Sequence, residues 1–304
     1  MDCKNLPKIE LHAHINGCLR RSTLHEFLQE DNKEYQIPAV IGIKEAFEIF
    51  SWVHSVMTTK ARLQRVVEEI LEDFENQNCL YIELRTTPKS TKFMSKQEYL
   101  STIVSVFTSN SRKIKAKLLI SINRSQSLEE AWENLHLAQT CEKCVGLDFS
   151  GNPMANKFNY YVEVFNEARK SGLKITVHTA EIEDEEDTVD ILNFRPDRIG
   201  HCNYLSERCE NLVKDLRIPM EICPSSNMAT IGLGSMVDHH FGKFYGFDHP
   251  IAICTDDTLL FDTDISKEYE LVANAYSLGD EDLKKIVKNS AEMAFSDEAL
   301  EGLS

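Results

Sequence analysis

Short apolar and β-branched runs recur along the chain, and longer stretches with helical spacing separate them. Eight of these runs have the length and residue types of buried strands. They are residues 8–14, 80–87, 116–123, 145–151, 174–181, 198–201, 218–226 and 250–257. Between several of them apolar residues recur every three to four positions, as in residues 63–74 and 161–168. That spacing is typical of amphipathic helices that pack one face on a core.

Eight strands alternating with helices in a chain of 304 residues favour a (β/α)8 barrel over the alternative, a doubly wound open sheet. The sequence contains no internal repeat and no low-complexity linker, so we expect residues 1–304 to form a single barrel domain. The first connection, residues 16–79, is far longer than one crossover needs. We therefore expect extra helices between the first and second strands, lying over the barrel mouth.

Composition and charge exclude several classes of function. A hydrophobic content of 42% can bury a large core, but no run of about 18 apolar residues could span a bilayer. The first residues, MDCKNLPKIE, lack the apolar stretch of a signal peptide, so we expect a cytosolic protein. The formal charge of −16 argues against nucleic acid or membrane as partner, because both are polyanionic. The nine cysteines are expected to be free thiols, including the isolated C-x-x-C pair Cys141 and Cys144.

Side chains of metal-binding or proton-transfer type collect at the carboxyl ends of four predicted strands, where barrel enzymes place their chemistry. These residues are His12, His14, His178, Glu181, His201, Asp256 and Asp257. Because side chains alternate along a strand, His12 and His14 point to the same face, here the barrel interior. Together with His178 and Asp256 they could form a nitrogen and carboxylate set of the kind that zinc takes.

Ordinary explanations compete with this interpretation. A lone His-x-His pair in a strand is usually two polar residues without a metal, but packing alone has no use for imidazoles and carboxylates at four strand ends. His25, His136 and His249 lie in helical or loop contexts and are expected to be surface or structural residues. The adjacent pair His239 and His240 either lines the barrel mouth or only forms hydrogen bonds.

The segments ELHAHINGC, HTAE, RIGHC and ICTDD, in this order and at these separations, resemble the adenosine deaminase family of zinc-dependent barrel enzymes. The resemblance covers nearly the whole chain. It implies one zinc ion per chain, bound by His12, His14, His178 and Asp256. It also implies that Glu181 is the proton shuttle and that His201 orients the nucleophile. Asp257 and the backbone of Gly151 would then contact the purine.

The implied reaction, hydrolytic loss of an amine from C6 of a purine, explains why these residue types are needed. Zinc supplies a nucleophile by lowering the pKa of bound water to about 7. Glu181 would protonate N1 and help carry a proton to the departing amine, while His201 would stabilise the developing oxyanion. The H-x-E and P-C-x-x-C motifs of the base-editing zinc deaminases are absent.

Asn16 points to a particular branch of the family, because the adenosine enzymes carry an aspartate there. At about 4–5 Å and an effective dielectric near 20, a carboxylate would repel a phosphate by roughly 3–4 kcal/mol, and neutral Asn16 removes that penalty. With TTPK and GLDFSGNP, this resembles the branch that hydrolyses N6-methyl-AMP to IMP and methylamine. The nucleotide contacts implied by that resemblance are His14, Asn16, His54, Thr86, Thr87, Pro88, Lys89, Asn123, Gly151, Glu181 and Asp257.

Two positions depart from the family pattern, since Asn123 replaces the usual aspartate of this branch and Cys202 replaces a glycine. Without the resemblance, TTPK would be interpreted as a turn containing a proline. Two other functions stay open. A plain adenosine deaminase would differ only at the phosphate end, and a non-enzymatic nucleoside-binding protein would be expected to lose a metal ligand or Glu181. We expect a small purine nucleotide as ligand and a monomeric protein.

Overall fold

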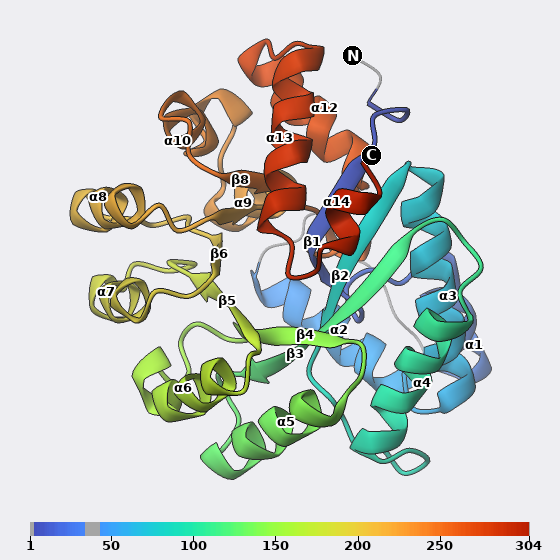
Figure 1. The fold of residues 1–304 in the computed structure, drawn as a ribbon. Helices are drawn as coiled ribbons and strands as arrows, with labels where there is room; N and C mark the ends of the chain where they lie inside the picture. The colour runs from blue at the N-terminus through green and yellow to red at the C-terminus, as the bar shows by residue number, and fades with distance from the viewer. Residues whose placement is uncertain (1–2, 34–42, 304) are drawn as a thin grey trace.

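Eight parallel strands form one sheet in the computed structural model, which describes residues 3–33 and 43–303 (Figure 1). Their order in the sheet follows the chain from β1 to β8. The strands are β1 (Lys8–His14), β2 (Cys79–Thr86), β3 (Lys115–Asn123), β4 (Cys144–Ser150), β5 (Lys174–Thr179), β6 (Arg198–His201), β7 (Met220–Ile222) and β8 (Ile251–Ile253). A parallel bridge between Ala13 and Asp256 joins β1 to the segment after β8. The sheet is therefore a nearly closed barrel, which confirms the predicted (β/α)8 fold.

Helices surround the barrel and pack apolar faces on it. In the described residues they are α1 (Arg21–Glu30), α2 (Ile43–Val56), α3 (Lys60–Asn76), α4 (Lys96–Ser109), α5 (Leu128–Thr140), α6 (Val162–Lys170), α7 (Glu185–Phe194), α8 (Glu207–Leu216), α9 (Pro224–Ile231), α10 (Phe241–Gly246), α11 (Thr258–Phe261), α12 (Ile265–Tyr276), α13 (Asp280–Met293) and α14 (Glu298–Glu301), with short 3₁₀ helices at Phe158–Tyr161 and Met236–Asp238. Helices α1 to α3 occupy the long first connection, and α2 lies across one end of the barrel (Figure 1). Phe50 of α2 lines a cavity there together with residues from the strand ends. This confirms the expectation of extra helices over the barrel mouth.

Three strands end two or more residues earlier than the sequence predicted. β5 stops at Thr179 because Ala180 has the left-handed φ of 51°, which no strand continues. β7 ends at Ile222 because Pro224 begins α9, and proline is favoured in the first turn of a helix. β8 ends at Ile253, and Asp256 beyond it has φ 62°. These turns place the polar residues that follow the strands in the lining of the cavity.

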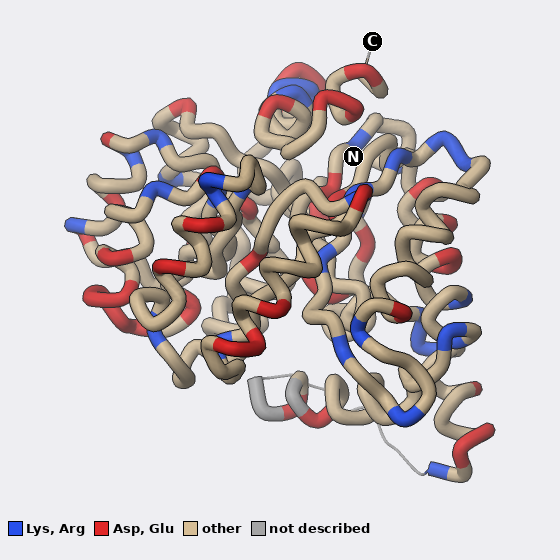
Figure 2. Tube along the Cα trace, turned by 60° about the horizontal axis from the view of Figure 1, so that its bottom comes forward, with Lys and Arg blue, Asp and Glu red and all other residues tan. Residues whose placement is uncertain are grey.

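The distribution of charged residues and the state of the cysteines agree with what the composition predicts. Asp and Glu positions are spread over the outer helices with Lys and Arg between them, so the view in Figure 2 shows no extended basic face. Within the described residues, no helix combines the length and apolar character needed to cross a membrane. No cysteine of the described residues, Cys141 and Cys144 included, forms a disulfide.

Candidate active site

A cavity of about 700 Å³ opens at the carboxyl ends of the barrel strands. This volume lies within the usual range for small-molecule sites. The cavity brings together residues of β1 to β6, of the segments that follow β7 and β8, and of α2, and all of the predicted nucleotide contacts line it. These are His14, Asn16, His54, Thr86, Thr87, Pro88, Lys89, Asn123, Gly151, Glu181 and Asp257.

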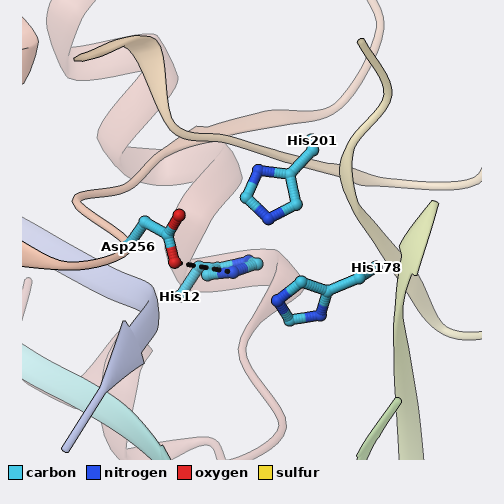
Figure 3. A group of neighbouring side chains, drawn as sticks. All are labelled: His12, His178, His201 and Asp256. Atoms are coloured by element: carbon cyan, nitrogen blue, oxygen red, sulfur yellow. Dashed lines mark ion pairs between the residues drawn. The ribbon is translucent and has the colours of Figure 1, made fainter. Parts of the chain in front are cut away.

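Four side chains of the types that bind metal ions converge beside this cavity (Figure 3). One ligand atom from each of His12, His178, His201 and Asp256 lies within 4.8 Å of the other three. His14 adjoins the group, because its Nε2 is 3.2 Å from Nε2 of His178 and 3.3 Å from Oδ1 of Asp256. The structure therefore brings together the four predicted ligands and also His201, which the sequence assigned a different role.

Buried carboxylates orient two of these imidazoles. His12 Nδ1 lies 2.7 Å from Oε2 of Glu221, and His178 Nδ1 lies 3.0 Å from Oδ1 of Asp148. Arg85 bridges the two carboxylates, at 2.9 Å to Asp148 and 2.8 Å to Glu221. A carboxylate at Nδ1 keeps the ring proton on that nitrogen and leaves the lone pair of Nε2 for a metal. These three supporting residues were not predicted from the sequence, although charged side chains at inward positions of apolar strands were a visible signal.

The charges and donor atoms of the group suit a cation. Nε2 of His12 is buried and, within the described chain, has no hydrogen-bond partner. Burial and Arg85 act to lower the pKa of His12, but Asp256 and Glu221 outweigh them and raise it to about 9. Ser226 Oγ donates to Oδ2 of Asp256 at 2.7 Å, which leaves Oδ1 facing the rings. Imidazole nitrogens with one carboxylate oxygen are a donor set that fits zinc.

Two further carboxyl groups present buried oxygens at the cavity. Oε2 of Glu181 and Oδ1 of Asp257 have no hydrogen-bond partner in the part of the chain that the structure describes. Burial raises the pKa of Glu181, and burial together with Asp256 raises the pKa of Asp257. A carboxyl group that keeps its proton can donate a hydrogen bond to a ring nitrogen. Glycine is required at Gly17, because a Cβ there would lie 1.5 Å from Oδ1 of Asp257.

Hydroxyl and ammonium groups gather in another part of the cavity. Thr86 Oγ1 is 2.7 Å from the Tyr99 hydroxyl, which also hydrogen-bonds Asn16, so the loop after β1 is tied to the end of β2. Lys89 is half-buried, and no carboxylate of the described residues forms an ion pair with it. Burial lowers the pKa of Lys89 to about 7. An ammonium group without a counter-ion beside hydroxyls is suited to an anionic ligand.

The two positions that depart from the family pattern both lie at turns of the backbone. Asn123 Oδ1 accepts a hydrogen bond from Ser125 N at 2.9 Å, and a Cβ on Gly151 would lie 2.6 Å from the Asn123 side chain. Asn123 therefore holds a turn against Gly151, and its contact with a nucleotide stays a prediction. Cys202 has φ 61°, a conformation that favours glycine, and it follows His201 with φ 62°.

The remaining histidines lie outside the cavity lining. His249 Nε2 is 2.7 Å from the carbonyl oxygen of Ile218, so His249 is a structural residue. His25 and His136 lie on exposed faces of α1 and α5. The adjacent pair His239 and His240 was expected either to line the barrel mouth or only to form hydrogen bonds. His239 is buried and hydrogen-bonded, which confirms the second alternative for this residue.

Known proteins resemble this chain in both sequence and fold. A family model described as adenosine deaminase matches residues 7–301. The N6-mAMP deaminase of Arabidopsis thaliana is 31% identical over an alignment of 333 positions, which covers 97% of this chain and 94% of the relative. The N6-methyl-AMP deaminase of Homo sapiens is 32% identical over 298 residues, covering 90% and 84%. A crystal structure of Arabidopsis ADAL complexed with IMP is similar with a TM-score of 0.92 at 31% identity, covering 99% of this chain and 96% of the other.

Proposed function

The chain belongs to the adenosine deaminase family and is a hydrolytic deaminase, and we propose that it converts N6-methyl-AMP and water to IMP and methylamine. The observation that carries this proposal is Lys89, a half-buried ammonium group without a carboxylate partner in the described chain. It lines the same cavity as Thr86 and Asn16, in a protein whose net charge is −16. A locally held positive charge in an acidic protein is suited to a substrate with a 5′-phosphate. Relatives named for N6-methyl-AMP and a similar structure with IMP bound support this choice.

We propose further that one zinc ion is held by His12, His14, His178 and Asp256. In support, the buried Nε2 of His12 has no hydrogen-bond partner among the described residues, and carboxylates at Nδ1 leave Nε2 of both His12 and His178 free to coordinate. When bound, zinc would supply a nucleophile from water at neutral pH.

The roles proposed for the remaining side chains follow from where protons must move. Glu181 holds a proton at Oε2 and delivers it to N1 of the purine, which makes C6 a better electrophile. Asp257 donates to N7 and the backbone N–H of Gly151 donates to N3, so the ring is held in one orientation. His201 donates a hydrogen bond to the oxygen that forms its bond at C6. Glu181, now without its proton, accepts the proton of the oxygen added at C6 and passes it to the departing methylamine, which leaves the C6 carbonyl of IMP.

The plain adenosine deaminase is the alternative, and a set of substrates separates the two. We expect kcat/KM to be highest for N6-methyl-AMP among N6-methyl-AMP, AMP, N6-methyladenosine and adenosine, with IMP as the product. Asn16→Asp should lower the ratio of kcat/KM for N6-methyl-AMP to that for N6-methyladenosine by up to a few hundred-fold, because charge repulsion of roughly 3–4 kcal/mol acts only on the monophosphate. Lys89→Ala should lower the same ratio by removing an attraction.

The ratio is its own control, because damage to metal binding or folding lowers turnover of both substrates alike. An unchanged ratio in both variants would mean that no phosphate lies between Asn16 and Lys89. The adenosine deaminase function would then be the better account.

The lowered pKa of Lys89 predicts a pH dependence. A phosphate monoester is a dianion above about pH 6, and Lys89 loses its proton as the pH rises through about 7. The ratio of kcat/KM for the monophosphate to that for the nucleoside should therefore fall between pH 6.5 and pH 9. Burial and Lys89 lower the pKa of the neighbouring His54 to about 4, so His54 titrates below this window.

Two variants check the assignment to Lys89. Lys89→Arg should flatten the profile, because a guanidinium group stays charged over this range. Lys89→Ala should give a flat and lower profile. A ratio that still falls with pH in Lys89→Arg would assign the titration to another group.

We also propose that this single catalytic domain works as a monomer in the cytosol. The support is the continuity of one barrel over the described residues and the absence of a membrane-spanning helix among them. The predictions of monomeric state and location otherwise rest on the sequence.

A further inference from the structure

His201 lies in the same group as His12 and His178, but its second ring nitrogen has a different neighbour. Nδ1 of His201 is 3.1 Å from Nδ2 of Asn227, whereas the Nδ1 atoms of His12 and His178 face carboxylates. Asn227 lies on α9 and is fully buried. The direction of the hydrogen bond between Asn227 and His201 decides which nitrogen of His201 carries the proton.

The carboxamide of Asn227 can have only one orientation. The backbone N–H of Cys223 donates to Oδ1 of Asn227 at 3.2 Å. A backbone N–H is always a donor, so the atom that it contacts must be the carboxamide oxygen. The other end of the carboxamide, which faces His201, is therefore the NH₂ group. It donates to Nδ1 of His201, and that nitrogen is an acceptor without a proton.

The hydrogen bonds of His239 support the same orientation of the Asn227 carboxamide. The backbone N–H of Phe241 donates to Nδ1 of His239 at 2.9 Å, so this nitrogen also carries no proton. Burial lowers the pKa of His239 to about 3, which leaves a neutral ring with its single proton on Nε2. Nε2 lies 3.3 Å from Oδ1 of Asn227 and donates to it. Two backbone amides thus fix the direction of every hydrogen bond from His239 through Asn227 to His201.

We propose that Asn227 and His239 are positioning residues that keep the proton of His201 on Nε2. A neutral ring with its proton there has no lone pair on Nε2, so His201 does not bind the metal although it lies within the group. His12 and His178 have the opposite arrangement, because Nδ1 of each ring lies against a carboxylate, 2.7 Å from Glu221 and 3.0 Å from Asp148 respectively. The same ring atom is therefore a ligand in two residues and a hydrogen-bond donor in the third.

The Nε2–H group of His201 has a defined role in catalysis, and this role rests on the proposed function. The oxygen that adds to C6 gains negative charge in the transition state, and a fixed N–H directed at it stabilises that charge. The left-handed backbone of His201, with φ 62°, is a strained conformation of the kind that structures retain where it places a functional side chain. Asn227 and His239 do not line the cavity, so they act only through His201.

The direct test is the tautomer of His201 in the zinc-loaded wild-type protein without substrate. Long-range ¹H–¹⁵N NMR distinguishes the two neutral tautomers, and the signal is assigned by its loss in His201→Gln. We expect the tautomer with the proton on Nε2. A proton on Nδ1, or a metal-bound Nε2, would overturn the proposal. Because no substrate is present, this result is independent of whether N6-methyl-AMP is the substrate.

Substitutions then test whether the neighbours set the tautomer. Asn227→Asp replaces the donor by an acceptor, so the proton of His201 should move to Nδ1 while the zinc content stays near one equivalent. Loss of the directed donor should lower kcat by about 10²-fold. An unchanged tautomer in a folded Asn227→Asp protein would contradict the proposal. If this variant does not fold, the wild-type spectrum alone decides.

His239 offers a matched comparison. His239→Gln keeps a donor for Asn227 and an acceptor for the Phe241 amide, and it should retain kcat within a few-fold and the wild-type tautomer. His239→Leu removes both groups and should lower kcat about tenfold with a mixed tautomer signal. His249→Gln is the control, because His249 is equally buried but lies before β8 and contacts the Ile218 carbonyl. Equal losses in His239→Gln and His239→Leu would indicate a packing role only.

Discussion

His178→Ala is expected to abolish both metal binding and turnover. The His178 ring is buried between Asp148, 3.0 Å from its Nδ1, and His14, 3.2 Å from its Nε2. Removing it takes a nitrogen ligand from the group and leaves the carboxylate of Asp148 without this partner. Residues that only support a ligand typically contribute 10–100-fold to metal affinity, so loss of a ligand should cost at least about 10²-fold. Elemental analysis should find near one equivalent of zinc in the wild type and almost none in the variant.

A matched control separates metal loss from damage to the fold. His249 is as buried as His178, each residue being 4% exposed, but it lies at the other end of β8 from Asp256. His249→Ala should keep the metal and the activity of the folded fraction. A wild-type protein that turns over substrate without any metal would end the zinc proposal.

Glu181→Gln is expected to keep the metal and to lower kcat by at least about 10²-fold, the usual scale of general acid–base catalysis. Glutamine has nearly the same shape, but it cannot hold or transfer a proton at the position of Oε2. Burial raises the pKa of Glu181, so in the wild type the carboxyl group is suited to carry a proton toward neutral pH. The measurement is kcat for N6-methyl-AMP together with zinc content.

Glu183→Gln is the control for this substitution. Glu183 belongs to the same acidic segment but is exposed, so its replacement should change neither kcat nor zinc content. If Glu181→Gln retained the wild-type rate, another group would have to transfer the proton.

The barrel could be predicted because strand residues and helical spacing alternate so regularly along the chain. The strand ends were harder, because they depend on single backbone conformations. Residues 218–226 appeared as one strand, whereas β7 ends at Ile222 and α9 begins at Pro224. Proline at that position was a signal for a helix start. The left-handed turns at Ala180 and Asp256 have no such signal, since neither residue is glycine.

The cavity residues could be predicted because polar side chains at the ends of apolar runs are conspicuous, and the family resemblance assigned their roles. The supporting residues could not be predicted in the same way. Glu221 and His12 are 209 positions apart, and nothing in the local sequence pairs them. Glycine is needed at position 200 because of a similarly distant residue, since a Cβ there would lie 2.8 Å from Cε1 of the His12 ring. Such requirements arise only when distant strands become neighbours.

Closure of the barrel between β1 and the segment after β8 affects how the protein is made in the cell. Glu10 accepts hydrogen bonds from Thr255, which is 245 positions further along the chain, and Asp256 follows directly. At about 5–20 residues per second, the ribosome adds Thr255 roughly 10–50 s after Glu10. During that time the histidines of β1 have no carboxylate from the far end of the chain. A nascent chain therefore cannot assemble the complete set of ligands proposed for zinc, and on that proposal metal loading waits until synthesis is nearly finished.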